Sequence, residues 1–280
     1  MKRTFLLGVG AQKAGTSWLY SLLEQSEQFA PGFTKEYHIW DVRTVPVFRP
    51  LRRRLRDIRF GQRKHRRQDL RVWLMENLPT RYFSYFDRLL AADGKTLTAD
   101  ITPAYSALDV ATLRRIRAGI VARGMTFRCV FIMRDPVKRC LSAFNMHRNQ
   151  GTGEVMEGVR LGAERTEAFR DYVVSDDARL RTAYEQTLRA LGEALPAEET
   201  MVLIYEELFR PETITRLEAF LGIPLDQDHL ETQIFKTDYR EAPDPEAVKL
   251  CFETYRPTYD AVAEQFPQVR ELWYGLKKYT

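Results

Sequence analysis

Short, continuous hydrophobic runs recur along this chain, and each leads through a turn into residues with the spacing of a helix. The runs lie at residues 5–9, 97–105, 127–133 and 201–205, and the second of them ends in a proline turn. Continuous runs of this length are typical of strands buried in a parallel sheet, and strands that alternate with helices are typical of α/β folds. The pattern therefore predicts a three-layer α/β/α fold with a central parallel sheet.

The segments between these runs predict the helices. Helical spacing occurs at roughly 15–26 and at 160–192, and two further helices begin at Pro136 and Pro211, the second of which ends near Gly222. Proline is suited to the first turn of a helix, where its missing N–H group is not needed.

The length and composition place limits on the domain organisation. The chain has 280 residues, 44% of which are hydrophobic, and no shift in composition marks a boundary. This is enough for a large hydrophobic core. We expect one domain over residues 1–280, in which residues 43–95 form a basic, helical segment resembling an insertion.

The first strand leads directly into a small, polar turn. Gly10 and Gly15 allow backbone N–H groups to approach an anion, and the helix that follows offers its positive N-terminus. The two glycines have the spacing of the nucleotide-triphosphatase loop G-x-x-x-x-G-K-[ST], but Thr16 stands where that loop requires lysine, and Lys13 lies inside the turn instead. The turn predicts a P-loop-like phosphate site, with an ordinary strand-turn-helix junction as the alternative.

A second candidate anion site follows the run at 127–133. Arg134 stands at the end of this predicted strand, and Ser142 lies two turns into the next helix. Both side chains would project toward one side, where an arginine fork and a hydroxyl group can share a phosphate.

Together these two segments resemble the nucleotide-binding motifs of sulfotransferases that use 3′-phosphoadenosine 5′-phosphosulfate (PAPS). Lys-x-Gly-Thr-[Thr/Ser] is typical of their 5′-phosphosulfate loop, and Arg-Asp-Pro-x-x-Arg-x-x-Ser is typical of their 3′-phosphate motif. Both stand in the family's order and lie far apart in the chain, which is more specific than either alone. The resemblance implies PAPS-binding roles for these residues: Lys13, Ala14, Gly15, Thr16, Ser17, Trp18, Arg134, Ser142 and Tyr205, and also Lys236 and Arg240.

Three of these assignments rest on the resemblance alone. The family often has a tyrosine near adenine in a Tyr-Glu-[Asp/Glu]-Leu segment, which is Tyr205 in this chain; a core tyrosine is the alternative. Lys236 and Arg240 stand where the family has a basic loop over the nucleotide, but this segment lacks the glycine of that loop.

The segment from Phe33 to Asp41 is dense in acidic, basic and aromatic residues. It resembles the Lys-Glu-x-His-Phe-Phe-Asp stretch of glycan-type sulfotransferases, whose glutamate acts as the general base. The resemblance implies that Glu36 is the base, that Lys13 neutralises the bridging oxygen of the donor, and that His38 and Trp40 lie at the acceptor. A solvated loop charge is the alternative for Glu36.

The resemblance also implies acceptor contacts for Asp100 and Tyr105. Both residues come at the carboxyl end of the second predicted strand, where ligands of open α/β sheets gather. The chain keeps the Thr-Pro-x-Tyr part of the family's acid-Lys-[Ser/Thr]-Pro-x-Tyr segment, but Ile101 replaces the lysine. This departure removes one cation and argues against a heparan-type acceptor.

Residues 43–71 carry twelve arginine or lysine residues against only Asp57 and Asp69, whereas the net charge of the whole chain is +5. Such a density attracts acidic glycans, the headgroups of anionic membranes, or nucleic acid. A basic, solvated helix face is the alternative. Dedicated nucleic-acid binding is not expected, because stacking aromatic residues are not interleaved with these cations.

The remaining features define the predicted function class. Cys129, Cys140 and Cys251 are widely spaced, which predicts reduced, structural thiols and no metal site. The N-terminal apolar run is too short for a signal peptide, so a cytoplasmic protein is expected.

The prediction is sulfuryl transfer from PAPS, without a metal, to a hydroxyl or amine of a glycan, a lipid or a small molecule. The rivals are a phosphoryl-transfer kinase and a noncatalytic polyanion-binding protein.

Overall fold

Five parallel strands form one sheet at the centre of the molecule. The computed structural model describes residues 3–60, 66–92, 94–150, 164–227 and 244–280. The strands are β1 (Thr4–Gly8), β2 (Phe29–Ala30), β3 (Leu97–Ile101), β4 (Thr126–Met133) and β5 (Thr200–Ile204), and their order in the sheet is β2-β3-β1-β4-β5. Leu7 of the central strand lies opposite Asp100 of β3 and Cys129 of β4.

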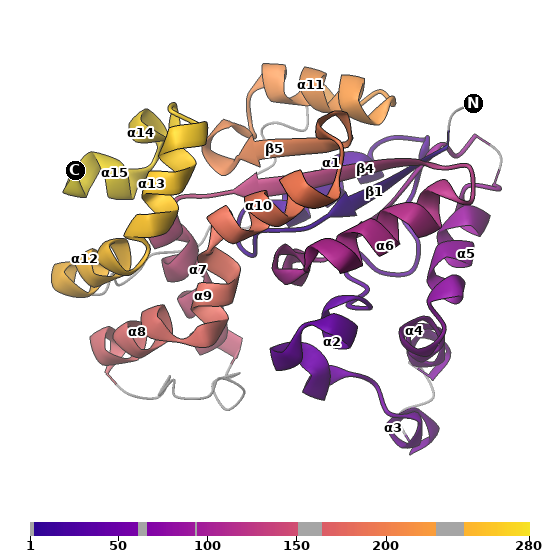
Figure 1. Cartoon of the computed structure of the whole chain (residues 1–280), viewed down its shortest axis with the longest axis horizontal. Coiled ribbons are helices and arrows are strands. Elements are labelled where there is room, and N and C mark those ends of the chain that lie inside the picture. Colours follow the sequence, from indigo (N-terminus) through magenta and orange to yellow (C-terminus); the bar gives the residue numbers. More distant parts are fainter. Residues whose placement is uncertain (1–2, 61–65, 93, 151–163, 228–243) are drawn as a thin grey trace.

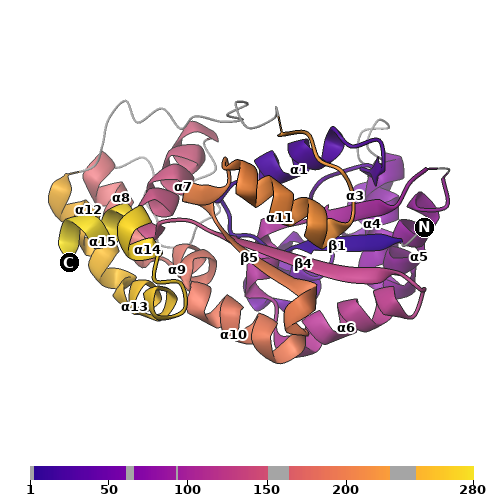
Figure 2. The ribbon, with the colours of Figure 1, turned by 90° about the horizontal axis from the view of Figure 1, so that it is seen from above.

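Helices cover both faces of this sheet. In Figure 2, α1 (Thr16–Glu24) and α11 (Pro211–Leu221) lie on one side of the strands, and α6 (Val110–Val121) and α10 (Tyr184–Ala194) lie on the other. This arrangement confirms the predicted three-layer α/β/α fold with a central parallel sheet.

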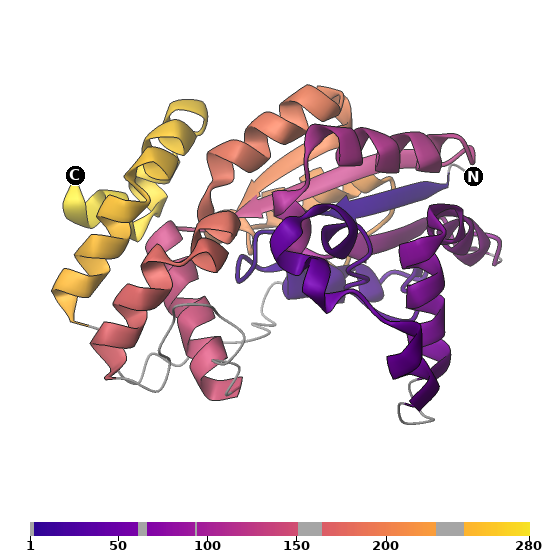
Figure 3. The same ribbon diagram turned by 60° about the horizontal axis from the view of Figure 1, so that its bottom comes forward.

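The remaining helices lie mostly at the two ends of the molecule (Figure 1). One group comprises α2 (Asp41–Thr44), α3 (Leu55–Phe60), α4 (Arg66–Asn77) and α5 (Pro79–Leu89). The other comprises α7 (Pro136–Gln150), α8 (Arg165–Val174), α9 (Asp176–Thr182), α12 (Pro245–Thr254), α13 (Arg256–Gln265), α14 (Val269–Leu272) and α15 (Tyr274–Tyr279). Short 3-10 helices occur at Pro46–Leu51, Pro103–Ala107, Ala197–Glu199 and Tyr205–Glu207. Figure 3 shows the indigo-to-purple helices on the opposite side from the yellow C-terminal ones.

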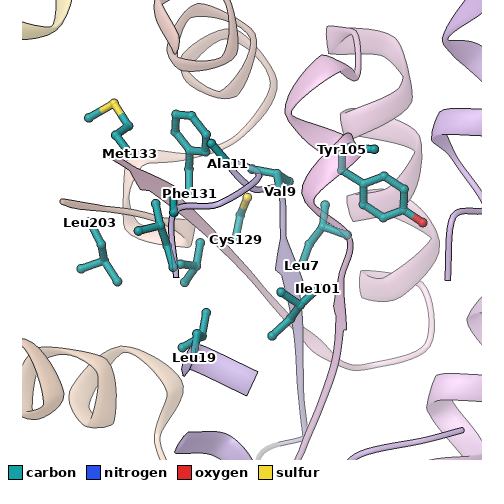
Figure 4. Packing of buried hydrophobic residues seen from close by; sticks show 14 of the residues in the cluster. Leu7, Val9, Ala11, Leu19, Ile101, Tyr105, Cys129, Phe131, Met133 and Leu203 are labelled. Carbon is teal, nitrogen blue, oxygen red and sulfur yellow. The ribbon is translucent and has the colours of Figure 1, made fainter. Parts of the chain in front are cut away.

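The core is built on the buried central strands, as the hydrophobic runs predict. All five residues of β1 and of β3 are buried. In Figure 4, Leu7, Val9 and Ala11 lie beside Ile101 and Cys129 from the neighbouring strands. The three cysteines are free and buried, as predicted.

Several elements differ from the predictions. The helical pattern at 160–192 divides, in its described part, into α8, α9 and α10, and the run at 97–105 forms a strand only to Ile101. The run at 201–205 forms a strand only to Ile204, because Tyr205 begins a 3-10 turn. The two-residue strand β2 was not predicted, because a strand this short leaves no period in the sequence.

The strand order places a topological switch at β1. From β1 the chain passes first to β2 and β3 on one side, and then to β4 and β5 on the other. Ligands of open α/β sheets bind at the carboxyl ends of the strands at such a point. The segments that follow the five strands at this edge of the sheet, among them the segment after β2, therefore form the candidate site.

Candidate active site

The loop between β1 and α1 is fastened to the neighbouring strand. The amide of Val9 donates to the carbonyl of Val130 at 3.0 Å, and the amide of Ala11 donates to the carbonyl of Ile132 at 2.7 Å. Gly10 has a φ of +119°, and a Cβ atom there would lie 2.8 Å from a backbone carbonyl oxygen. Only glycine fits this position, which agrees with the predicted close approach of the backbone to an anion.

The second half of the loop turns sharply into α1. Lys13 has a φ of +65° and Gly15 a φ of +93°. A left-handed conformation at a lysine is uncommon, and such conformations cluster at functional sites. The N–H groups of Thr16, Ser17 and Trp18 begin the helix and therefore have no acceptor within it. The loop thus ends in open amides at the positive end of α1, which favours an anion.

Two half-buried cations lie at this cradle. Arg134, which follows β4, donates from Nη1 to the carbonyl oxygen of Lys13 at 2.9 Å, and its guanidinium lies 4.2 Å from the ring centroid of Tyr205. Among the described residues, neither Lys13 nor Arg134 is paired with a carboxylate, and Nε of Arg134 is buried without a hydrogen-bond partner. Burial lowers the pKa of Lys13, and the charges of Arg134 and Lys35 lower it further. A bound anion would relieve the repulsion among the positive charges of Lys13, Arg134 and Lys35.

Lys35 connects the phosphate loop to the acidic segment. Its Nζ atom lies 3.0 Å from Oγ of Ser17, 3.4 Å from Oγ1 of Thr16 and 2.8 Å from Oε1 of Glu36. Sequence reasoning assigned Lys35 no role, although its position directly before Glu36 in the matched motif was a usable signal. The bridge places Glu36 beside the loop between β1 and α1.

Glu36, His38 and Asp41 form a chain of hydrogen bonds. Nε2 of His38 lies 3.3 Å from Oε2 of Glu36, and Nδ1 of His38 lies 2.6 Å from Oδ2 of Asp41. The backbone of His38 is left-handed, with a φ of +53°. This turn directs both ring nitrogens toward carboxylates.

These contacts set the charges of the three groups. Burial alone would raise the pKa of Glu36, but the hydrogen bond from His38 and the charge of Lys35 outweigh burial and lower the pKa to about 2. Burial opposes the charged form of His38 as well, but the hydrogen bonds to Asp41 and Glu36 raise its pKa to about 9. At neutral pH Glu36 is therefore ionised and His38 is protonated.

A buried carboxylate lies beneath this segment. Asp100 is fully buried; Oδ1 accepts from the hydroxyl of Thr102 at 2.6 Å, and Oδ2 accepts from Tyr82 at 2.8 Å and Tyr105 at 2.9 Å. Burial raises the pKa of Asp100 to about 6, against the effect of these three hydrogen bonds. The carboxyl group thus anchors hydroxyl groups in the interior.

The same hydroxyl groups hold the acidic segment in place. Tyr105 accepts at its hydroxyl from the amide of Ile39 at 3.0 Å, and Thr102 accepts from the amide of Tyr37 at 3.0 Å. Only 1% of Tyr105 and 1% of Trp40 is exposed. We expected Asp100, Tyr105 and Trp40 to contact an acceptor. Because all three are buried, they are better placed to support the segment that carries Glu36.

The sequence of the chain matches the family model of the sulfotransferase domain over residues 3–249. The chain belongs to the sulfotransferase family. Its structure is similar to a sulfotransferase from Alicyclobacillus acidocaldarius (TM-score 0.59, 19% identity, covering 95% of this chain and 96% of that chain). It is also similar to the sulfotransferase domain of the Synechococcus PCC 7002 olefin synthase (TM-score 0.50, 16% identity, with the same coverage). At these identities the structural likeness shows a shared fold. A comparison with curated protein sequences found no match.

The other predicted nucleotide-binding residues of this sulfotransferase differ in accessibility. Tyr205 is half-buried and lies beside Arg134, but Ser142 on α7 is only 1% exposed. Trp18 is 3% exposed and packs edge-on against Phe209, with ring centroids 5.4 Å apart. Ala14 is buried in the loop. Lys236 and Arg240 lie outside the described residues.

Two carboxylates to which sequence reasoning gave no role, Asp135 and Glu206, hold the turn that follows Arg134. Oδ1 of Asp135 accepts from the amide of Lys138 at 2.8 Å, as a helix N-cap does, and Oδ2 accepts from the hydroxyl of Tyr259 at 3.0 Å. The amide of Asp135 donates to Oε1 of Glu206 at 3.2 Å. Burial raises the pKa of Glu206 to about 7. The Asp-Pro pair after a strand was an available signal for the cap, and the Tyr-Glu-[Asp/Glu]-Leu segment was one for Glu206.

In the described part of the chain, no helix is long and apolar enough to cross a membrane. The same residues contain no cluster of His, Cys, Asp and Glu side chains arranged to hold a metal ion.

Proposed function

We propose that this sulfotransferase moves a sulfuryl group from PAPS to a hydroxyl or amine group of an acceptor, with Glu36 as the general base. One observation carries the proposal. Lys13 and Arg134 lie together at the open amides of α1 without a carboxylate partner among the described residues, and Lys35 joins Glu36 to the same loop. An anion-binding cradle and an ionised carboxylate thus belong to one site.

The residues present fit the two phosphates of PAPS. The N–H groups of Gly15, Thr16 and Ser17 and the charge of Lys13 would hold the 5′-phosphosulfate. Arg134 would hold the 3′-phosphate, since its guanidinium is half-buried beside the loop and is not paired with a carboxylate among the described residues. Ser142 is a weaker candidate for the 3′-phosphate because its side chain is almost fully buried. The ring of Tyr205, which stacks on Arg134, remains the proposed neighbour of adenine.

When bound, PAPS supplies the sulfuryl group, and the protein contributes position and charge. Lys13 would neutralise the negative charge that grows on the departing phosphate oxygen. The pKa of Lys13 is lowered by burial and by its cationic neighbours, and an anion at the cradle would raise it again. Lys13 would therefore carry its full charge when the donor is bound.

Glu36 is ionised and able to accept the proton of an acceptor group. A carboxylate whose pKa is about 2 is nevertheless a weak base. We infer that its hydrogen bond from His38 or its ion pair with Lys35 loosens as donor and acceptor enter, which raises its proton affinity. His38 then orients Glu36, and Asp100, Tyr105 and Trp40 support the segment. In this proposal, these four residues position Glu36, whereas the sequence predicted that they contact the acceptor.

The remaining predictions concern the context of the reaction. A single domain over residues 1–280, a cytoplasmic location, and a glycan, lipid or small-molecule acceptor stay predictions. Contact between residues 43–71 and a membrane surface or a polyanion also stays a prediction.

The deciding experiment offers the purified protein sulfur-labelled PAPS with a panel of alcohols, phenols, amines and glycans. We expect label to move to at least one acceptor class, and labelled ATP to transfer no phosphate to the same panel. Calorimetry with adenosine 3′,5′-bisphosphate tests donor binding separately. Absence of nucleotide binding would refute the proposal, and phosphate transfer would favour the kinase rival.

A further inference from the structure

A cavity of about 690 Å³ lies between the segment that follows β2 and the helices α4 and α5. Its volume is in the range of small-molecule sites. The described residues that line it combine apolar side chains, among them Phe33, Leu74 and Leu89, with four cations, and none of them is a carboxylate.

The apolar part of the cavity is held in a defined shape. The amide of Phe33 donates to the hydroxyl of Tyr85 at 3.0 Å, and the two rings pack edge to face with centroids 5.3 Å apart. The hydroxyl of Tyr85 also lies 3.2 Å from that of Tyr37. Phe33 is thus fixed by α5 from one side, and it stands three residues before Glu36.

The cations of the cavity have no carboxylate partner in the described part of the chain. Arg71, Arg81 and Arg88 are exposed, and within the described residues none of them is paired with a carboxylate. Arg71 lies 5.9 Å from the ring centroid of Phe33, and Lys95 donates to the backbone carbonyl of Glu27 at 2.8 Å. Like charges that converge on an apolar hollow attract an anion to it.

We propose that this cavity binds an anionic amphiphile. The apolar body of the ligand lies against Phe33, Leu74 and Leu89, and its carboxylate, sulfate or phosphate group is bound by Arg71, Arg81 and Arg88. Because Phe33 and Glu36 belong to one short segment, occupancy of the cavity would also restrict the segment that carries Glu36. The proposal concerns binding and stands independently of sulfuryl transfer.

Calorimetric titration with two amphiphiles that share an octyl chain tests the proposal, with both kept below their micellar concentrations. Octyl sulfate carries an anionic head, and octyl glucoside carries an uncharged one. We expect saturable binding of one octyl sulfate, and affinity for octyl glucoside weaker by about tenfold, which corresponds to 1.4 kcal/mol. Equal affinity for the two would overturn the assignment of the arginines.

Variants then locate the site. Arg81→Gln combined with Arg88→Gln removes two charges but keeps most of each side chain, and should weaken octyl sulfate binding by about tenfold while leaving octyl glucoside unaffected. Arg270→Gln, an exposed arginine on α14, is the matched control and should bind as the unaltered protein does. Unchanged affinity in the double variant would contradict the proposal. So would displacement of octyl sulfate by adenosine 3′,5′-bisphosphate, because it would place the ligand at the phosphate loop instead.

Discussion

Two clusters of cations in this protein differ in what their charges contact. Lys13 and Arg134 meet at the carboxyl end of the sheet, without a carboxylate partner in the described part of the chain. In the basic segment 43–71, by contrast, Arg43, Arg52 and Arg53 converge on Glu76.

Glu76 contacts three of the twelve cations of this basic segment. Its side chain is fully buried, and its carboxylate accepts from the amide of Arg53 and from Nη1 of Arg53, each at 3.1 Å. Arg43 and Arg52 donate to its backbone carbonyl. Burial raises the pKa of Glu76 even though Arg53 opposes the shift. The comparison teaches that the density of cations along a sequence does not measure the charge available to a ligand.

The largest effect is expected for Glu36→Gln. The amide keeps the shape of the side chain but cannot accept a proton, so PAPS affinity should persist while turnover on an aliphatic alcohol falls by about 10² to 10⁴. Steady-state kinetics and calorimetry measure the two quantities, and Glu253→Gln, at an exposed position on α12, is the control. Full turnover on such an acceptor would transfer the base role to His38 or Asp100. With phenols of low pKa the loss should be smaller.

Lys13→Ala should lower turnover by about 10² to 10³, because the charge of the lysine is needed more in the transition state than in the ground state. Lys277→Ala, an exposed position on α15, serves as the control. The melting temperature of both variants shows whether the fold is kept. Turnover near that of the unaltered protein would show that Lys13 has no role in catalysis. Its charge would then be no more available to a ligand than the charges around Glu76.

Arg134→Ala should weaken the binding of adenosine 3′,5′-bisphosphate by about 1.5 to 3 kcal/mol, the usual contribution of a charged hydrogen bond. Binding of adenosine 5′-monophosphate should hardly change, because it lacks the 3′-phosphate. Ser142→Ala tests the second residue of the motif in the same calorimetric assay. Equal losses for both nucleotides would show that Arg134 acts through the loop at Lys13 and not on the 3′-phosphate.

Glu76→Gln probes the second cluster. Loss of the buried carboxylate leaves Arg53 without its main partner, and we expect the free energy of unfolding to fall by about 1 to 2 kcal/mol, since Arg53 is partly solvated. Nucleotide affinity should stay unchanged. Urea unfolding measures the loss, and exposed Glu193→Gln is the control. A variant as stable as the unaltered protein would mean that these arginines contribute nothing to folding.

The smallest effect concerns pH. The raised pKa of His38 means that its stabilising charge is fully present below about pH 6.5 and is lost as the pH rises toward 9. The lowered pKa of Glu36 means that its contribution is present above about pH 4.5 and is lost as the pH falls toward 2. The stability difference between the unaltered protein and His38→Asn should therefore be greatest between these limits, at pH 4.5 to 6.5.

The expected size of that difference is below about 1 kcal/mol, because both side chains are more than one third exposed and solvent screens them. Urea unfolding at pH 6 and pH 9 provides the measurement. A difference that grows toward pH 9 would contradict the proposed ion pairs.

Much of the fold was predictable from local patterns. The continuous hydrophobic runs predicted β1, β3, β4 and β5, and Gly10, Gly15 and Pro136 marked the turns and helix starts that the structure contains. These features are local: a strand buried on both faces must be apolar throughout, and a left-handed turn favours glycine. The prediction that Lys13 and Arg134 bind the same nucleotide came only from a resemblance to a family with known motifs, and their contact is seen only in the structure.

The contacts that shape the site were decided by the tertiary structure. Nothing in the spacing of Lys35 and Ser17, or of Asp100 and Tyr82, shows that their side chains meet, because each pair comes from segments that the sheet brings together. The partners in turn set the charges: the pKa of Glu36 falls to about 2 beside His38 and Lys35, while burial raises that of Asp100 to about 6. Residue types determined which groups can ionise, but burial and neighbours, which only the folded chain provides, determined how strongly each group holds its proton.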